Sequence, residues 1–219
     1  DVVKRLAMAH PDVAFTMSNE DRKTLNVTVG DEVGEQALLK RLGAILGRDF
    51  KDNALAIDAE REGLRLKGFA GVPTFNRGNA QHQFLFVNGR SVKDRVLVGA
   101  VRGAYQDFLA RNRHPILALF LEVPPEFVDV NVHPAKAEVR FKDQGLVRGL
   151  IVSSLRHALG EAGHRASTTV SGAALGAMRA EGSQPAMPFQ RMGGAYNRLP
   201  SGFHDTSQSQ TPYASEAQM

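Results

Sequence analysis

The chain contains no cysteine and no tryptophan among its 219 residues, and only 7% of its residues are aromatic. Without cysteine, a disulfide scaffold, a thiolate zinc site and a cysteine nucleophile are excluded. The seven histidines show no pair at metal-ligand spacing, so we expect no metal site. No apolar run approaches the roughly 20 residues of a membrane span, and the first residues lack the layout of a signal peptide. We therefore expect no membrane segment, and the absence of cysteine fits a reducing compartment.

Motifs of self-sufficient enzymes are also missing. The sequence has no G-x-x-x-x-G-K-[ST] phosphate loop, no G-x-G-x-x-G fingerprint and no nucleophile elbow. Glu60 and Glu62 lie close together, but in a polar stretch where solvated surface carboxylates are usual. We expect this chain alone to be catalytically inactive.

The composition changes near residue 164. Hydrophobic residues make up 42% of the chain and charged residues 23%, which allows a packed core. Residues 164–219 are rich in Ser, Gly, Ala, Gln and Pro, and their large apolar residues show no helical or strand period. We predict a folded domain over residues 1–163 and a flexible, disordered tail or linker over 164–219.

The folded part alternates strand and helix patterns. A hairpin is predicted around residues 18–21, a helix over 35–46 that ends at Gly47, and a last helix from Val147 that closes at Gly160 and Gly163. Strands are predicted over 13–17, 25–29, 64–72, 84–87, 116–123, 128–132 and 138–141. The continuous apolar run at 84–87 is typical of a strand covered on both faces. The pattern as a whole predicts an α+β fold, a two-layer sandwich with helices on one face of the sheet.

The clearest pattern is an amphipathic helix in which apolar residues recur with helical spacing from Leu97 to Leu109. Asp94 lies in its first turn. The opposite face carries Arg95, Val98, Gly99, Arg102 and Gln106. Residues 90–113 hold six cations, Arg90, Lys93, Arg95, Arg102, Arg111 and Arg113, against two anions. Two interpretations stay open at this point: a solvated basic surface, or a site that follows a phosphate backbone without reading bases.

A second unusual segment surrounds Lys136. Pro134 ends a strand, which places Lys136 on a short loop at a sheet edge. An ordinary surface lysine and a phosphate contact both fit this position. Asn88 and Gly89 are interpreted as turn residues.

The segments FVNGRSVKDRVLVGAVRGAY and VPPEFVDVNVHPAKAEVRF resemble the bacterial MutL family of DNA mismatch repair proteins. RLAMAHPDVAF, LLKRLGAILG and LKGFAGVPTFNR continue the resemblance in order, over residues 1–163. It implies that a GHKL-type ATPase domain precedes this segment, with residues 1–10 as the end of a helix from that domain. The segment itself then resembles the transducer domain, a ribosomal-protein-like two-layer fold with a left-handed β-α-β crossover. A linker and a C-terminal dimerisation domain follow in the family.

The resemblance also implies residue roles. Lys136 corresponds to a lysine that contacts the γ-phosphate of ATP, which with Mg²⁺ is held mainly by the preceding domain. Arg95 corresponds to an arginine implicated in DNA binding, and Arg90, Lys93 and Arg102 are added from helix geometry alone. The implied partners are double- or single-stranded DNA, a MutS-type mismatch recognition protein, a downstream nuclease or helicase, and a second copy in a homodimer, in the bacterial cytoplasm. Because the ATPase motifs would lie before residue 1, ATP hydrolysis is not expected of this chain alone.

Three other functions fit the sequence less well. A small-molecule kinase of this architecture would need a glycine- and serine-rich phosphate loop at a helix start, which is absent. An RNA-binding module would be expected to show exposed aromatics or a more basic surface. The transducer domain of a GHKL topoisomerase also uses a lysine that reaches ATP, but the strings around Asn88 and His133 favour the MutL family.

Overall fold

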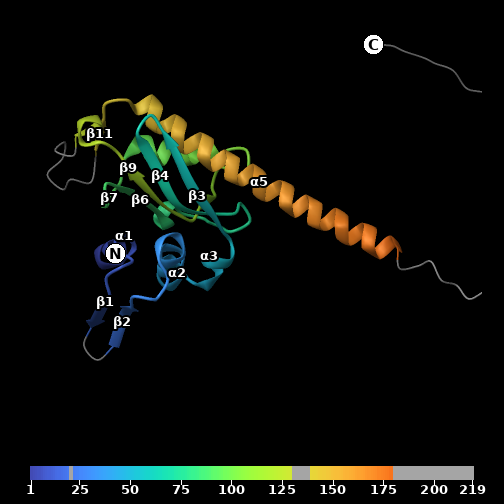
Figure 1. Cartoon of the computed structure of the whole chain (residues 1–219), viewed down its shortest axis with the longest axis horizontal. Coiled ribbons are helices and arrows are strands. Elements are labelled where there is room, and N and C mark those ends of the chain that lie inside the picture. Colours follow the sequence, from blue (N-terminus) through green and yellow to red (C-terminus); the bar gives the residue numbers. More distant parts are fainter. Residues whose placement is uncertain (20–21, 130–138, 180–219) are drawn as a thin grey trace, which may run out of the picture. The chain divides into compact units, whose positions relative to one another are not determined.

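The structure is a computed structural model that describes residues 1–19, 22–129 and 139–179. Its α-helices are α1 (Val2–Ala9), α2 (Gly34–Leu46), α3 (Arg48–Asp52), α4 (Arg95–Tyr105) and α5 (Gln144–Arg179), shown in Figure 1. Its longer strands are β1 (Phe15–Asn19), β2 (Arg22–Val27), β3 (Ala54–Arg61), β4 (Leu64–Gly71), β6 (Gln83–Val87), β7 (Arg90–Val92) and β9 (Leu117–Glu122). Short elements complete the chain: β5 (Asn76–Arg77), η1 (Ala80–His82), β8 (His114–Pro115), η2 (Pro125–Phe127), β10 (Val128–Asp129) and β11 (Arg140–Phe141).

A five-stranded sheet with the order β3-β4-β9-β6-β7 organises the domain. Neighbouring strands are antiparallel except β6 and β9, which are parallel. Parallel strands need a crossover, and here the chain passes through β7 and α4 between them. The β-α-β unit is therefore confirmed, while its left-handed crossover stays a prediction.

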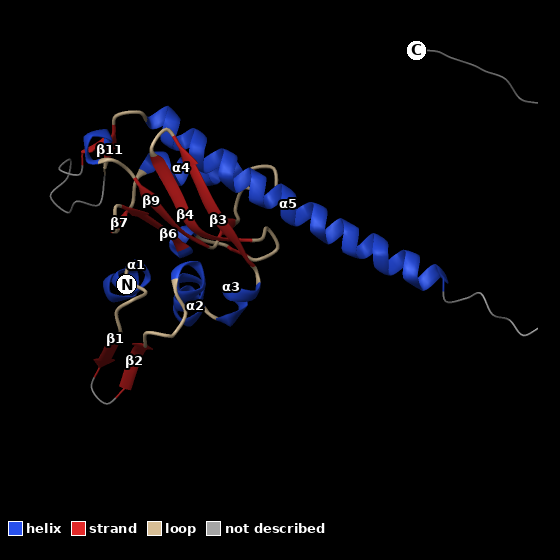
Figure 2. Cartoon of the chain, viewed as in Figure 1, coloured by secondary structure: helices blue, strands red, loops and turns tan. Residues whose placement is uncertain are grey.

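Helices cover both faces of this sheet (Figure 2). On one face, α4 and α5 bury Leu97, Val101 and Leu155 against strand residues such as Leu119. On the other face, α1, α2 and α3 pack a second cluster, which contains Met8, Leu42, Phe50, Phe69, Phe84, Phe86, Ile116 and Ala118. The α+β class is confirmed, but the expectation that helices lie on one face was wrong. Because β6 is apolar at consecutive positions, both of its faces need cover.

The β1–β2 hairpin is joined to α1 and α2 through a buried arginine. The Arg41 side chain on α2 is only 3% exposed and faces backbone carbonyls rather than a carboxylate. Its guanidinium donates hydrogen bonds of 2.8–3.2 Å to the carbonyl oxygens of Ala7, His10, Pro11, Val13 and Thr28. One side chain thus connects the end of α1, the following turn and both sides of the hairpin.

Two predicted helix ends differ from the structure. The stripe from Leu97 predicted a helix through Leu109, but α4 ends at Tyr105, and Phe108 is 42% exposed. The last helix was expected to close by Gly163, but α5 continues to Arg179. Glycine costs a helix only about 1 kcal/mol relative to alanine, and no proline occurs between Pro134 and Pro185 to break the helix. The predicted flexible linker therefore begins with helical residues up to Arg179, and residues 180–219 lie outside the described part.

Within the described residues, no helix is long and apolar enough to cross a membrane.

Candidate nucleic-acid interface

Local structure before α4 fixes the position of its first turn. Asn88 (φ 47°) and Gly89 (φ 78°) form the tight turn between β6 and β7, where positive φ at both positions suits a two-residue hairpin. The Asn88 side chain exchanges two hydrogen bonds of 2.8 Å with the backbone of Val123. Asp94, 7% exposed, then caps α4 by accepting hydrogen bonds from the amides of Val96 (2.8 Å) and Leu97 (3.1 Å). The expected turn and the carboxylate at the helix start are both present.

The C-terminal end of α4 is fixed by Tyr105. Its hydroxyl donates a 2.7 Å hydrogen bond to the carbonyl oxygen of Gly71 on β4. Burial raises the pKa of Tyr105 above its ordinary value, so the hydroxyl stays protonated and keeps donating. With both ends held, α4 is a rigid support for its outward face.

That outward face is the one expected from the sequence. Arg95, Val98, Gly99, Arg102 and Gln106 are all exposed. A Cβ atom added at Gly99 would meet nothing within 4 Å, so the surface between the two arginines is open. A long polyanion can therefore approach the helix backbone closely at this point.

The predicted DNA contacts are solvent-exposed cations without acidic partners. Arg90 lies on β7, Lys93 follows that strand, and Arg95 and Arg102 lie on α4; all four are exposed. Among the described residues, none of these four forms an ion pair or side-chain hydrogen bond. Their positive charges therefore remain available to a ligand, apart from screening by salt.

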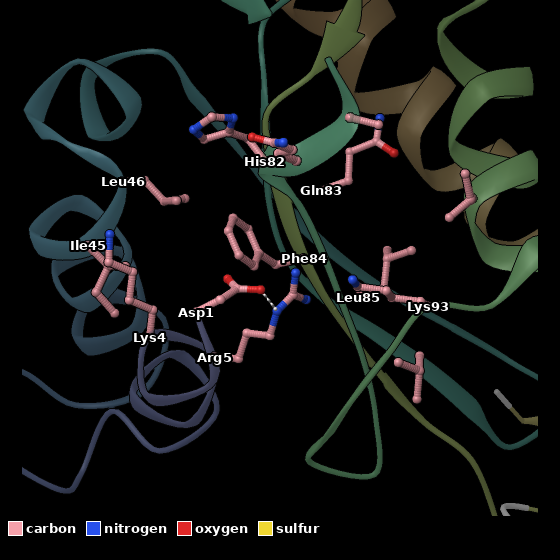
Figure 3. Close-up of a pocket in the computed structure, with 14 residues that line it drawn as sticks. Asp1, Lys4, Arg5, Ile45, Leu46, His82, Gln83, Phe84, Leu85 and Lys93 are labelled. Carbon is pink, nitrogen blue, oxygen red and sulfur yellow. Dashed lines mark hydrogen bonds and ion pairs between the residues drawn. The ribbon is translucent and has the colours of Figure 1, made fainter. Parts of the chain in front are cut away.

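A pocket of about 730 Å³ borders the N-terminal part of this surface. Figure 3 shows Lys4 and Arg5 of α1 and Lys93 around it. Arg5 donates a 3.0 Å hydrogen bond to the Ser91 hydroxyl and lies 4.9 Å from the centre of the Phe84 ring. Lys4 and Arg5 were not predicted as site residues, because only packing brings α1 next to β7.

A second pocket, of about 510 Å³, borders the C-terminal part of α4. Gln83 lines both pockets, while Val98 lines the first and Gly99 the second, so the two depressions adjoin the same helix face. Four arginines line the second pocket, namely Arg102, Arg111, Arg113 and Arg148. Arg102, Arg111 and Arg113 belong to the basic stretch of residues 90–113. Arg148 comes from α5 and was not anticipated.

Lys136 lies outside the described residues, as do His133 and Pro134. The structure does describe the two flanks of their segment, where β10 and β11 pair Val128 with Phe141 and Asp129 with Arg140. Phe141 is 4% exposed and belongs to the main core. The residues on either side of positions 130–138 are thus paired with one another and anchored to the domain core.

In the described part of the chain, no group of three or more acidic or histidine side chains could hold a metal ion.

Comparison with known proteins defines the class. Residues 42–160 match the family model described as "DNA mismatch repair protein, C-terminal domain". The chain is 64% identical over 186 residues to the "DNA mismatch repair protein MutL" of Phenylobacterium zucineum. This match covers 85% of this chain and 30% of that protein. Against the protein of the same name from Paramagnetospirillum magneticum, identity is 62% over 178 residues, covering 81% and 29%.

The chain therefore belongs to the MutL family of DNA mismatch repair proteins. It spans less than a third of the length of these relatives. A solved structure titled "Crystal Structure of N terminal domain of a DNA repair protein" matches with a TM-score of 0.59 and 20% identity, covering 73% of this chain and 52% of that one. At that identity the likeness supports the fold alone.

Proposed function

We propose that this domain binds the backbone of double- or single-stranded DNA along α4 and couples that binding to ATP held by a preceding domain. The observation that carries the DNA-binding part is the row of exposed, unpaired cations on and beside α4, with the bare Gly99 surface between them. Family membership favours mismatch repair over the RNA-binding and topoisomerase alternatives.

The chemistry of this surface suits binding without base recognition. Arginine and lysine neutralise phosphates and release condensed counterions, so affinity falls as salt rises and depends little on sequence. Arg95 is also the first residue of α4, where the helix dipole disfavours a positive side chain. A cation at that position is better explained by a bound anion than by helix stability.

The first experiment measures DNA affinity of the 219-residue chain over a salt series. Replacing both Arg95 and Arg102 by alanine should weaken binding and lower the slope of log affinity against log salt by about 0.9 per lost duplex contact. The variant that replaces both Arg48 and Lys51 by alanine is the matched control, because both are exposed cations on α3, the helix that packs on the opposite face of the sheet. An unchanged slope in the double variant would remove α4 from the DNA-binding surface.

We further propose that Lys136 contacts the γ-phosphate of ATP, which with Mg²⁺ would be held mainly by the preceding domain. An ammonium group is a compact point charge suited to detecting a terminal phosphate. The pairing of strands β10 and β11 supports this role, since it holds together the described residues that flank the Lys136 segment. Such a contact would favour one arrangement of the two domains and so promote dimerisation and the recruitment of a MutS-type protein and a downstream nuclease or helicase.

This part is tested in the full-length protein. Lys136→Ala should slow ATP turnover and weaken ATP-dependent dimerisation, whereas Lys142→Ala, an exposed lysine just after β11, should leave both unchanged. Wild-type turnover and dimerisation in Lys136→Ala would contradict the γ-phosphate contact.

A further inference from the structure

The pocket at the C-terminal part of α4 gathers arginines from three places in the chain. Arg102 lies on α4, Arg111 and Arg113 precede β8, and Arg148 lies on α5. All four are exposed at the rim of the same pocket. These arginines gather around one cavity, whereas the cations of an ordinary solvated surface are spread apart.

Among the described residues, Asp107 is the one carboxylate that lines this pocket, and it is already paired with a cation. Asp107 accepts a 2.7 Å hydrogen bond from Nη2 of Arg156, which itself does not line the cavity. Within the described residues, Arg102, Arg111 and Arg148 have no ion pair or side-chain hydrogen bond. The pocket therefore carries an uncompensated positive charge that suits an anionic ligand.

One of the arginines is held in position before any ligand arrives. Nε of Arg113 donates a hydrogen bond to Oδ1 of Asn76, and Nδ2 of Asn76 donates a 2.7 Å hydrogen bond to the carbonyl oxygen of Pro73. The Asn76 amide is thereby oriented with its oxygen toward Arg113. The guanidinium is fixed through Nε, which leaves its two Nη groups to donate to a phosphate.

The packing of α5 on α4 explains how Arg148 reaches the pocket. Arg156 donates a hydrogen bond to Asp107, and a Cβ atom at Gly103 would lie 4.0 Å from Val152. The two pairs have the same separation in sequence, so α4 and α5 run side by side in the same direction. One turn earlier, this offset brings Arg148 beside Gly99. The absence of side chains at Gly99 and Gly103 keeps this part of the pocket open.

We infer that this arginine pocket, Arg102, Arg111, Arg113 and Arg148, is a second phosphate-binding subsite that engages the same DNA strand as Arg95. The inference rests on the proposed DNA-binding function and extends its footprint past the end of α4. Arg95 and Arg102 are separated by seven residues, or about 10 Å along the helix axis. With about 3.4 Å per nucleotide step of a duplex strand, a ligand must span about four or more nucleotides to reach both Arg95 and the far side of the pocket.

The test compares a dinucleotide with an oligonucleotide of about sixteen nucleotides, the longer one both single-stranded and duplex, by fluorescence anisotropy with the 219-residue chain. The variant that replaces both Arg111 and Arg148 by alanine should bind the longer DNA about five- to tenfold more weakly per lost contact at 0.1 M salt, with a slope lower by about 0.9 per contact for duplex and about 0.7 for single strand. The shortest strand should lose less, because it can bind near Arg95 alone. The variant that replaces both Arg48 and Lys51 on α3 by alanine again serves as the charge-matched control.

Asn76→Ala tests the positioning of Arg113. It removes no charge, so it should lower affinity for the longer DNA while leaving the salt slope nearly unchanged, because the phosphate contact persists with a less ordered guanidinium. Circular dichroism and the thermal midpoint of each variant show whether the fold is retained.

Several outcomes separate this subsite from the broader proposal. If the Arg95 and Arg102 substitutions weaken binding but the Arg111 and Arg148 pair does not, the subsite is refuted while DNA binding by α4 stands. If neither double variant changes DNA affinity, the proposed function fails as well. If the Arg111 and Arg148 pair abolishes binding of polyglutamate but not of DNA, the pocket serves an acidic protein segment and the subsite is overturned.

Discussion

Replacing Arg41 by methionine should destabilise the domain by about 3 kcal/mol. The side chain acts in part as a cap for α1, because the carbonyls of Ala7 and His10 lie at the end of that helix and receive its Nη1 protons. A cation in a partly buried position at a helix C-terminus contributes up to about 2 kcal/mol. The remaining hydrogen bonds, to Pro11, Val13 and Thr28, contribute about 1 kcal/mol each.

Two effects make the net loss of stability smaller than the sum of these contributions. Several of the released carbonyls are only partly buried and can bond water, and removing the charge also removes its desolvation cost. That cost is visible in Arg41 itself, since burial lowers the pKa of its guanidinium while the Asp12 carboxylate opposes the change. A net loss of about 3 kcal/mol is a large part of the 5–15 kcal/mol typical of a domain.

The assay is denaturant unfolding combined with native-state hydrogen exchange. The amides of β1 and β2 should lose protection first, because Arg41 joins the hairpin to α1 and α2, whereas β9 in the main core should keep most of its protection. Arg41→Lys is the control that keeps the charge; its single ammonium cannot serve five carbonyls, so it should recover only part of the loss. A stability within about 1 kcal/mol of wild type for Arg41→Met would refute this reasoning.

Three further predictions concern the same domain. Asp94→Ala should cost about 1–2 kcal/mol in urea unfolding, because two amides at the start of α4 lose their acceptor; an unchanged midpoint would contradict the cap. Gly68→Ala should lower stability by at least about 3 kcal/mol, since the φ of Gly68 is +133° and a Cβ would overlap a backbone carbonyl of β9. Gly99→Ala, at an open helical position, should instead raise stability by about 0.5–1 kcal/mol. Thermal unfolding of the two variants compares them directly. A hydrogen bond from Arg65 holds the pKa of the Asp58 carboxyl below its usual range. This exposed pair therefore stabilises the fold above about pH 4, and the stabilisation is lost as pH falls through the depressed pKa. The thermal midpoint of Asp58→Asn should accordingly fall less on acidification than that of the wild type.

Local sequence signals predicted the parts of the fold that depend on neighbouring residues. Helix α2 ends at Gly47 as expected, and the Asn88-Gly89 pair makes its turn because both positions need positive φ. The outward face of α4 could be read from the apolar stripe alone, since helical periodicity assigns the opposite residues to solvent.

Features set by packing between distant segments were harder to predict. Strand β3 was missed because it lies at the sheet edge and has one buried residue, Ile57, among alanines and charges, so its pattern is weak. The second helical layer depends on α1 to α3 meeting β6. Arg148 joins the arginine pocket only because α5 lies parallel to α4, a relation between residues more than 40 positions apart.

The DNA-binding face of the domain is located most directly by mapping backbone amide shifts with NMR. Titrating a short duplex into the labelled chain should move the amide signals of residues 90–102 and of the residues lining the arginine pocket, and should leave those of α3 unchanged. Shifts concentrated on α2 and α3, with residues 90–102 unaffected, would contradict a DNA-binding face on α4.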